Sequence, residues 1–107
     1  SNMKIIAYTA SPITLKNAID KKITDKELKT WEIVKSDKKE VLYSHIPEQW
    51  REKAMPKPEI LNDKIEFVIR WWDDDEPEEF TKGYVLGRFV EILMVHFKDK
   101  FTHLKIK

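Results

Sequence analysis

Residues 64–72 read KIEFVIRWW, and the alternation in this run is the clearest strand signal in the chain. Side chains along a strand point alternately to opposite faces of a sheet. One face of this strand is apolar throughout and is expected in the core: Ile65, Phe67, Ile69 and Trp71. The other face carries Glu66, Val68, Arg70 and Trp72. The alternation therefore predicts a buried Trp71 and an outward Trp72, unless the last helix of the chain covers the second face as well.

This run is followed at once by residues 73–79, DDDEPEE, hereafter the acidic segment. The chain has 20 Lys+Arg and 19 Asp+Glu, but without the six acids of the segment the balance is 20 against 13, or +7. Such a concentration of like charge is solvated rather than buried. Beside large aromatic side chains it predicts a surface for a basic partner. The expected partner-binding residues are Trp72, Asp73, Asp74, Asp75, Glu76, Glu78 and Glu79.

Two other interpretations of the acidic segment remain open. Consecutive carboxylates suggest a cation site, but an EF-hand loop needs alternating ligands and a glycine at its sixth position, where this chain has Glu78. A run also presents its carboxylates divergently, so we expect no metal. The segment can instead be a solvated helix start, because acids are favoured near a helix N-terminus and Pro77 suits a first turn.

Two elements are predicted before residue 30. Apolar and β-branched residues predict a strand at residues 4–10. Ser11 and Pro12 suit a helix start, and the apolar spacing that follows predicts a helix over residues 12–23.

The middle of the chain is predicted to hold a hairpin and then a connection. Residues 30–36 and 40–45 both alternate and flank a polar turn, which indicates a β-hairpin. Prolines at positions 47, 56 and 58 argue against a central strand in residues 46–62. We therefore expect a long connection there, with one short helix at residues 48–54.

A helix and a last strand complete the prediction. Residues 80–97 are apolar around most of a helical circumference, so this helix is expected to be largely covered, and Gly83 and Gly87 permit close backbone approach. Residues 101–107 alternate and are expected to form an edge strand with protective lysines. The order is β-α-β-β-β-α-β, which predicts an α+β two-layer domain with a mostly antiparallel sheet packed by helices.

The composition fits one folded domain in the cytosol. At 107 residues, with 41% hydrophobic residues, the chain can bury a core without disulfides. It has no cysteine, which fits a reducing compartment. No apolar run approaches the roughly 20 residues of a membrane span. Ser1 and Asn2 before Met3 are typical of a tag remnant, so we expect the native protein to start at Met3 and to form a single domain over residues 3–107.

No catalytic motif is present in the sequence. The only two glycines lie inside the last predicted helix, so there is no glycine loop of the kind that cradles phosphates. The three histidines, His45, His96 and His103, fall in three different predicted elements. There is no nucleophile elbow and no cysteine nucleophile. We therefore expect neither enzymatic activity nor a cofactor.

In size, lack of cysteine and the acidic stretch from Trp72 to Glu79, the chain resembles the small bacterial immunity proteins that neutralise nuclease bacteriocins and contact-dependent growth-inhibition toxins. The resemblance implies a monomer that binds its cognate toxin one to one in the cytosol. It also implies occlusion of a basic active-site cleft, and an RNase is the first expectation. Two alternatives stay open: a regulatory or adaptor module for another basic protein, and an RNA-binding module that uses the basic body of the chain. No direct contact with nucleic acid or membrane is expected for an immunity protein.

Overall fold

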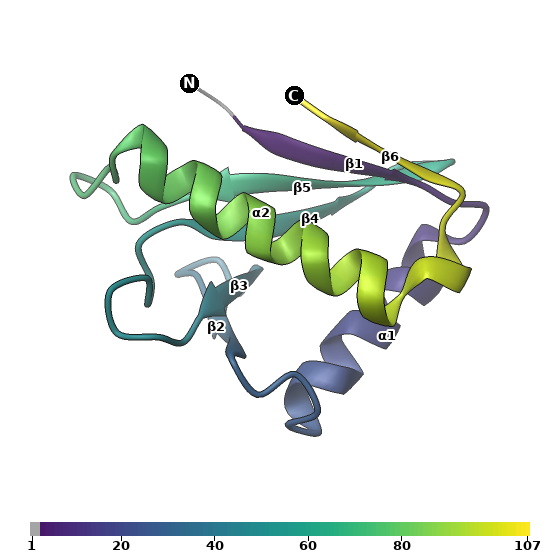
Figure 1. The fold of residues 1–107 in the computed structure, drawn as a ribbon, viewed down its shortest axis with the longest axis horizontal. Coiled ribbons are helices and arrows are strands. Elements are labelled where there is room, and N and C mark those ends of the chain that lie inside the picture. Colours follow the sequence, from purple (N-terminus) through teal and green to yellow (C-terminus); the bar gives the residue numbers. More distant parts are fainter. Residues whose placement is uncertain (1–2) are drawn as a thin grey trace.

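The computed structural model describes residues 3–107, so the proposed tag remnant at Ser1 and Asn2 lies outside the described residues. Its elements follow in the order β1 (Lys4–Tyr8), α1 (Pro12–Thr24), β2 (Trp31–Lys35), β3 (Val41–His45), β4 (Met55–Ile60), β5 (Lys64–Arg70), α2 (Glu79–His96), the 3-10 turn η1 (Lys98–Lys100) and β6 (His103–Ile106) (Figure 1). The α+β class is confirmed. The order contains one strand more than the sequence predicts, namely β4.

The strands form two antiparallel groups. β4, β5, β1 and β6 make a four-stranded sheet in that order, and β2 and β3 form a separate hairpin. β6 lies at the edge of the sheet, as predicted, and pairs with β1, so the first and last strands lie side by side (Figure 1). The predicted hairpin is confirmed, with Trp31 opposite His45 and Ile33 opposite Tyr43.

β4 corrects the prediction for residues 46–62. The expected short helix at 48–54 is absent and turns occupy its place, whereas Met55–Ile60 is a strand despite Pro56 and Pro58. The amide of Leu61 donates to the carbonyl of Lys64 (2.9 Å), so the amides of odd-numbered residues face β5. The two prolines therefore occupy positions whose missing N–H would face away from β5. An edge strand tolerates proline in this arrangement.

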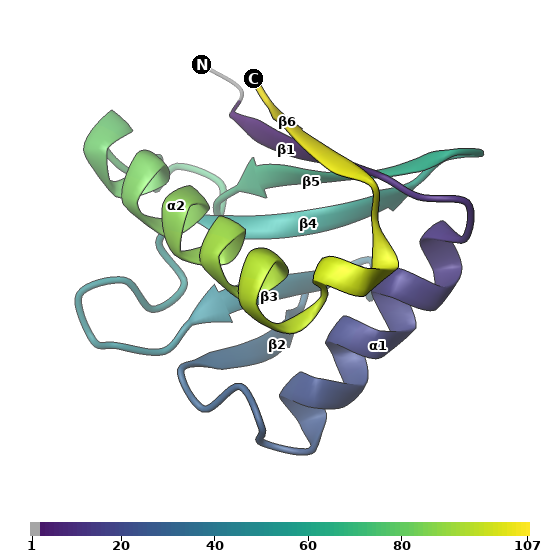
Figure 2. The same ribbon diagram turned by 45° about the vertical axis from the view of Figure 1, so that its right-hand side comes forward.

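The prolines coincide with a break in the sheet. β3 lies alongside β4, as the contacts between the two strands and Figure 2 show, yet the two are not hydrogen-bonded neighbours. Along this edge β4 has no N–H to donate at positions 56 and 58. We call this boundary the β3–β4 seam. It divides what would be one continuous sheet into two hydrogen-bonded parts.

Both helices contribute to a single core with the apolar face of the sheet. Leu15 and Ile19 of α1 and Phe89 of α2 belong to the same buried cluster as Ile5 and Phe67. The ring of Phe89 lies 4.9 Å from that of Phe67 and 5.4 Å from those of Trp31 and Tyr43, so it joins α2 to the sheet and to the hairpin. Because one cluster spans the whole described chain, the hairpin is anchored to the sheet by side chains.

α2 is less covered than the sequence predicts. One face of the helix is open to solvent although it is largely apolar, with Phe80 65% and Val95 67% exposed and with Tyr84 and Met94 also exposed. A Cβ built on either Gly83 or Gly87 would meet nothing within 4 Å, so no neighbouring backbone approaches them. Among residues 3–107, no helix is both long and apolar enough to cross a membrane.

Two buried polar side chains hold the hairpin in place. The hydroxyl of Tyr43 donates to Asp20 Oδ1 of α1 (2.6 Å), and burial is the first cause that raises the pKa of Tyr43. His45 packs against Trp31 and its Nδ1–H donates to the carbonyl of Thr30 (2.9 Å). Burial lowers the pKa of His45 below 6.5, and the charge of Arg88 adds to this, whereas the Thr30 carbonyl and Glu91 oppose it. His45 is therefore neutral in the folded protein near pH 7.

We expect the free energy of unfolding to fall as the pH drops below 6.5, the ordinary pKa of histidine. The folded state excludes a proton from His45 that the unfolded state takes up, so acid favours unfolding, by at most about 1.4 kcal/mol per pH unit for one proton. Urea unfolding between about pH 5 and pH 8 measures this slope. His45→Gln removes this group and should flatten the slope. An unchanged slope in His45→Gln would contradict the assignment.

Candidate functional site

The acidic segment forms an exposed loop between β5 and α2. Asp73, Asp74, Asp75 and Glu76 are exposed, as predicted for a run of like charge. The amide of Asp75 donates to the carbonyl of Trp72 (3.1 Å), and Asp74 has a φ of 64°, so the chain turns sharply at this point. α2 begins at Glu79 with Glu78 as its N-cap, so Pro77 precedes the helix instead of forming its first turn.

Lys82 of α2 holds the end of the acidic segment. Its side chain is 0% exposed, and its Nζ donates to Glu76 Oε2 (2.6 Å) and Glu79 Oε2 (2.7 Å). The same nitrogen lies 4.2 Å from the centre of the Trp71 ring. The hydrogen bond that Lys82 donates to Glu76, and then the one it donates to Glu79, raise the pKa of Lys82 above 10.5. The charged Lys82 therefore links the end of the loop to the helix.

Lys82 was not among the predicted site residues. It is the one charged residue between Glu79 and Arg88, and it lies three residues after Glu79. That spacing favours an ion pair on a helix surface, and it is the one signal in the sequence that pointed to this contact. The pairing with Glu76 depends on how the loop folds back, which the spacing does not reveal.

The predicted contrast between a buried Trp71 and an outward Trp72 is found only in part, because Trp71 packs against the core cluster and Trp72 does not, yet neither is fully buried. β5 ends at Arg70, so the alternation of the strand no longer applies to the two indoles. Both side chains are half-buried: Trp71 packs at the rim of the core, and Trp72 donates from Nε1 to Glu52 Oε1 (2.9 Å). Trp72 is thus accessible, as expected for a binding residue, but it is held in one orientation by the loop before β4.

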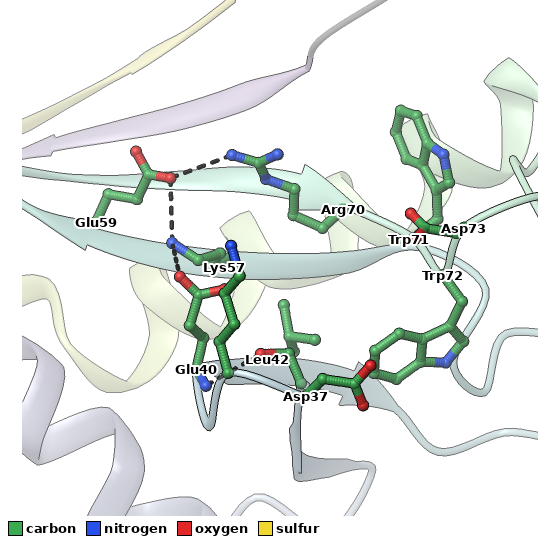
Figure 3. Close-up of a pocket in the computed structure, with 11 residues that line it drawn as sticks. Asp37, Glu40, Leu42, Lys57, Glu59, Arg70, Trp71, Trp72 and Asp73 are labelled. Atoms are coloured by element: carbon green, nitrogen blue, oxygen red, sulfur yellow. Dashed lines mark hydrogen bonds and ion pairs between the residues drawn. The ribbon is translucent and has the colours of Figure 1, made fainter.

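Beside the acidic segment, a groove of about 720 Å³ opens over the β3–β4 seam (Figure 3). The turn between β2 and β3 supplies one wall, with Asp37, Lys38 and Glu40. The other wall comes from the end of β5 and the residues after it, including Trp72 and Asp73. Leu42 and Lys57 lie between the walls. The groove therefore brings together a turn and a strand end that are thirty or more residues apart in the chain.

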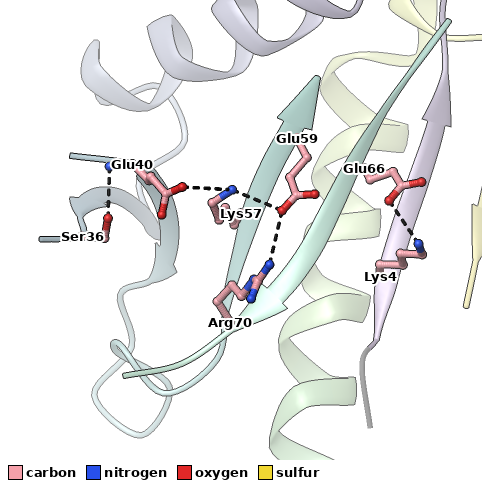
Figure 4. A network of polar contacts seen from close by, with 7 residues as sticks. All are labelled: Lys4, Ser36, Glu40, Lys57, Glu59, Glu66 and Arg70. Carbon is pink, nitrogen blue, oxygen red and sulfur yellow. Dashed lines mark hydrogen bonds and ion pairs between the residues drawn. The ribbon is translucent and has the colours of Figure 1, made fainter. Parts of the chain in front are cut away.

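One end of the groove is neutralised by a network of ion pairs (Figure 4). Lys57 Nζ lies 3.5 Å from Glu40 Oε2 and 3.2 Å from Glu59 Oε2, and Arg70 Nη2 lies 3.3 Å from the same Glu59 oxygen. Partial burial alone would raise the pKa of Glu59, but the hydrogen bonds from Lys57 and Arg70 outweigh it and hold this pKa below its usual value. The charges of these four side chains are therefore neutralised within the network.

The histidines do not form a catalytic group. His45 is buried against Trp31, His96 is exposed on α2, and His103 stacks on Tyr8 with ring centres 4.3 Å apart. Within residues 3–107, no three His, Asp or Glu side chains are grouped so that they could hold a metal ion.

Comparison of the chain with protein-family models, with curated proteins and with solved structures finds no match.

Proposed function

We propose that this protein binds and neutralises a basic protein partner through the acidic segment, as an immunity protein of the cytosol would. The observation that carries the proposal is the anchored, outward-facing loop. Asp73, Asp74, Asp75 and Glu78 are exposed and form no ion pair within the described residues. Four uncompensated carboxylates next to an accessible indole provide both long-range attraction and a contact for a desolvated interface.

The anchoring by Lys82 favours tight binding. A loop that is disordered when free must lose conformational entropy on binding, and this loss weakens the complex. Here the charged hydrogen bonds to Glu76 and Glu79 hold one end of the loop in the free protein. The remaining acids are thus presented at low entropic cost.

A nuclease toxin is the partner class that fits this surface. The active-site cleft of a nuclease is basic because its substrate is a polyanion. The acidic segment concentrates negative charge in a short stretch of chain and can therefore occupy such a cleft. The resemblance to immunity proteins supports the same choice, with an RNase as the first candidate and a role without catalysis. The adaptor alternative uses the same surface and differs only in the identity of the basic partner.

The RNA-binding alternative receives less support from the geometry. Several cations lie on the sheet face opposite the helices, but Lys4 pairs with Glu66 (3.1 Å), and Lys57 and Arg70 pair with Glu59. Cations that are neutralised locally release fewer counterions from a nucleic acid. Lys64 and Lys105 on the same face form no ion pair within residues 3–107, so only part of the positive charge of this face is neutralised.

The proposal is tested with the product of the adjacent upstream gene, where the toxin of an immunity protein is expected. Neutralising the four unpaired acids, as Asp73→Asn, Asp74→Asn, Asp75→Asn and Glu78→Gln together, leaves the Lys82 anchor intact. We expect association with that toxin domain to slow by roughly tenfold or more at low salt, because steering by charge is lost. The difference should shrink at about 1 M salt, where charges are screened within about 3 Å. Stopped-flow association kinetics measure both effects.

A control variant removes the same number of exposed acids elsewhere: Glu27→Gln, Glu48→Gln, Asp63→Asn and Asp99→Asn. It should associate much faster than the loop variant at equal net charge. If the two variants associate equally fast, net charge alone matters and the loop is a solvated helix start. Rescue of cells from toxin expression by the parent protein, and not by the loop variant, tests neutralisation directly. Salt-sensitive binding of RNA by the protein alone would favour the RNA-binding alternative.

A further inference from the structure

The groove beside the acidic segment has one end that is not neutralised. Of its four carboxylates, Glu40 and Glu59 are paired with Lys57 and Arg70. Asp37 on the turn wall and Asp73 on the opposite wall form no ion pair within residues 3–107. Both are exposed, and both line the groove at the end where Trp72 lies (Figure 3). This end combines negative charge on two walls with an aromatic ring.

Trp72 is placed to serve as a fixed surface at this end. Its indole N–H is taken by Glu52 (2.9 Å), which restrains the ring, while the side chain remains half-buried and in contact with the groove. An aromatic face attracts a cation within about 6 Å, and arginine is the cation most often found there. Carboxylates bind the planar guanidinium group through paired hydrogen bonds.

We infer that this end of the groove receives an arginine side chain of the basic partner, with the guanidinium on the Trp72 ring and its N–H groups directed to Asp37 and Asp73. The inference rests on the proposed function. It names a specific pocket for one side chain of the partner, whereas the proposed function requires only electrostatic attraction. The volume of about 720 Å³ exceeds one side chain and lies in the range of small-ligand sites, so a short backbone stretch of the partner fits as well.

Lys38 provides a second test of the inference, in which a substitution should strengthen binding instead of weakening it. It lines the same groove from the turn and has no ion pair within the described residues. A cation at this position competes with an incoming guanidinium for the same carboxylates. Its removal should therefore strengthen the binding of arginine, whereas removal of Asp37 should weaken it.

The probe is a capped tripeptide with a central arginine, and its control is the same peptide with citrulline, which has a similar shape and no charge. Titration is followed by the NMR signals of the four tryptophan indole N–H groups, assigned with single Trp→Phe variants. We expect the arginine peptide to shift the Trp72 signal and the citrulline peptide to leave it unchanged. Asp37→Asn should weaken the arginine peptide by roughly tenfold, and Lys38→Gln should tighten it about two- to threefold. Asp99→Asn, an exposed acid far along the chain, should change nothing.

Equal binding of the two peptides, or an Asp37→Asn variant that binds arginine like the parent, would overturn the inference. Failure of the pocket and failure of the proposed function are separable because Asp37 lies outside the acidic segment. If Asp37→Asn binds the toxin domain like the parent while the loop variant does not, the pocket is wrong and the function stands. If the arginine peptide binds as expected but no basic protein partner is neutralised, the pocket stands and the function is wrong.

Discussion

Phe89→Ala is expected to lower the free energy of unfolding by about 3–5 kcal/mol, the usual range for a large buried aromatic side chain. Phe89 is 0% exposed and its ring is in contact with Trp31, Tyr43 and Phe67. Truncation leaves a cavity bordered by the hairpin, the sheet and α2, and no one of these can fill it without losing its other contacts. Urea unfolding followed by far-UV circular dichroism measures the loss.

A second phenylalanine of the same helix provides the control. Phe80 is 65% exposed, so Phe80→Ala should stay within about 0.5 kcal/mol of the parent. Phe89→Leu keeps most of the volume and should lose less stability than Phe89→Ala, which keeps the comparison informative if the alanine variant does not fold. Similar losses at positions 80 and 89 would show that the core is not where the structure places it.

Trp72→Ala is expected to weaken binding of the toxin domain by about 2 kcal/mol or more, or roughly 30-fold in Kd. The indole forms part of the groove wall next to four unpaired acids, so its removal takes away the aromatic contact and leaves the charges. The change should appear mainly in the dissociation rate, because charge controls association. Isothermal titration calorimetry and surface-based kinetics measure the two quantities.

Comparison with Trp71→Ala separates binding from stability. Both indoles are half-buried, so we expect each alanine variant to cost about 1–2 kcal/mol of stability, instead of the strong contrast that strand alternation suggests. Trp72→Phe retains a ring but loses the hydrogen bond to Glu52, and it should bind with intermediate affinity. If Trp72→Ala matches the parent in toxin affinity, the indole is a structural residue only.

The elements that the sequence predicts correctly are those with a local period. Alternation in β5 and the hairpin, and helical spacing in α1 and α2, are properties of neighbouring residues and need no knowledge of the rest of the fold. β4 was missed because Pro56 and Pro58 exclude a strand only if it has neighbours on both sides. Its place at the edge of its sheet is set by tertiary structure, which residues 55–60 alone do not reveal.

In the candidate site too, local features could be predicted from the sequence and non-local ones could not. The exposure of Asp73–Glu76 could be predicted because a run of like charges is not buried without partners. The pairing of Glu76 with Lys82 depends on the turn around Asp74, and the groove depends on the approach of the residue 36–40 turn to Arg70–Asp73. Both are non-local. The alternation rule placed the two indoles correctly only in part, because it was extended two residues past the end of its strand.

The β3–β4 seam has a consequence for how the groove can adapt. Because β3 and β4 are not hydrogen-bonded neighbours, the hairpin is attached to the sheet through side chains such as Tyr43 and Trp31 rather than by a backbone ladder. A small sliding movement of the hairpin along the sheet then breaks no backbone hydrogen bonds between strands. Side-chain packing permits such shear motions more readily than a continuous hydrogen-bonded sheet would. One wall of the groove moves with the hairpin and the other with β5. The two prolines at the seam thereby allow the width of the groove to change when a partner binds.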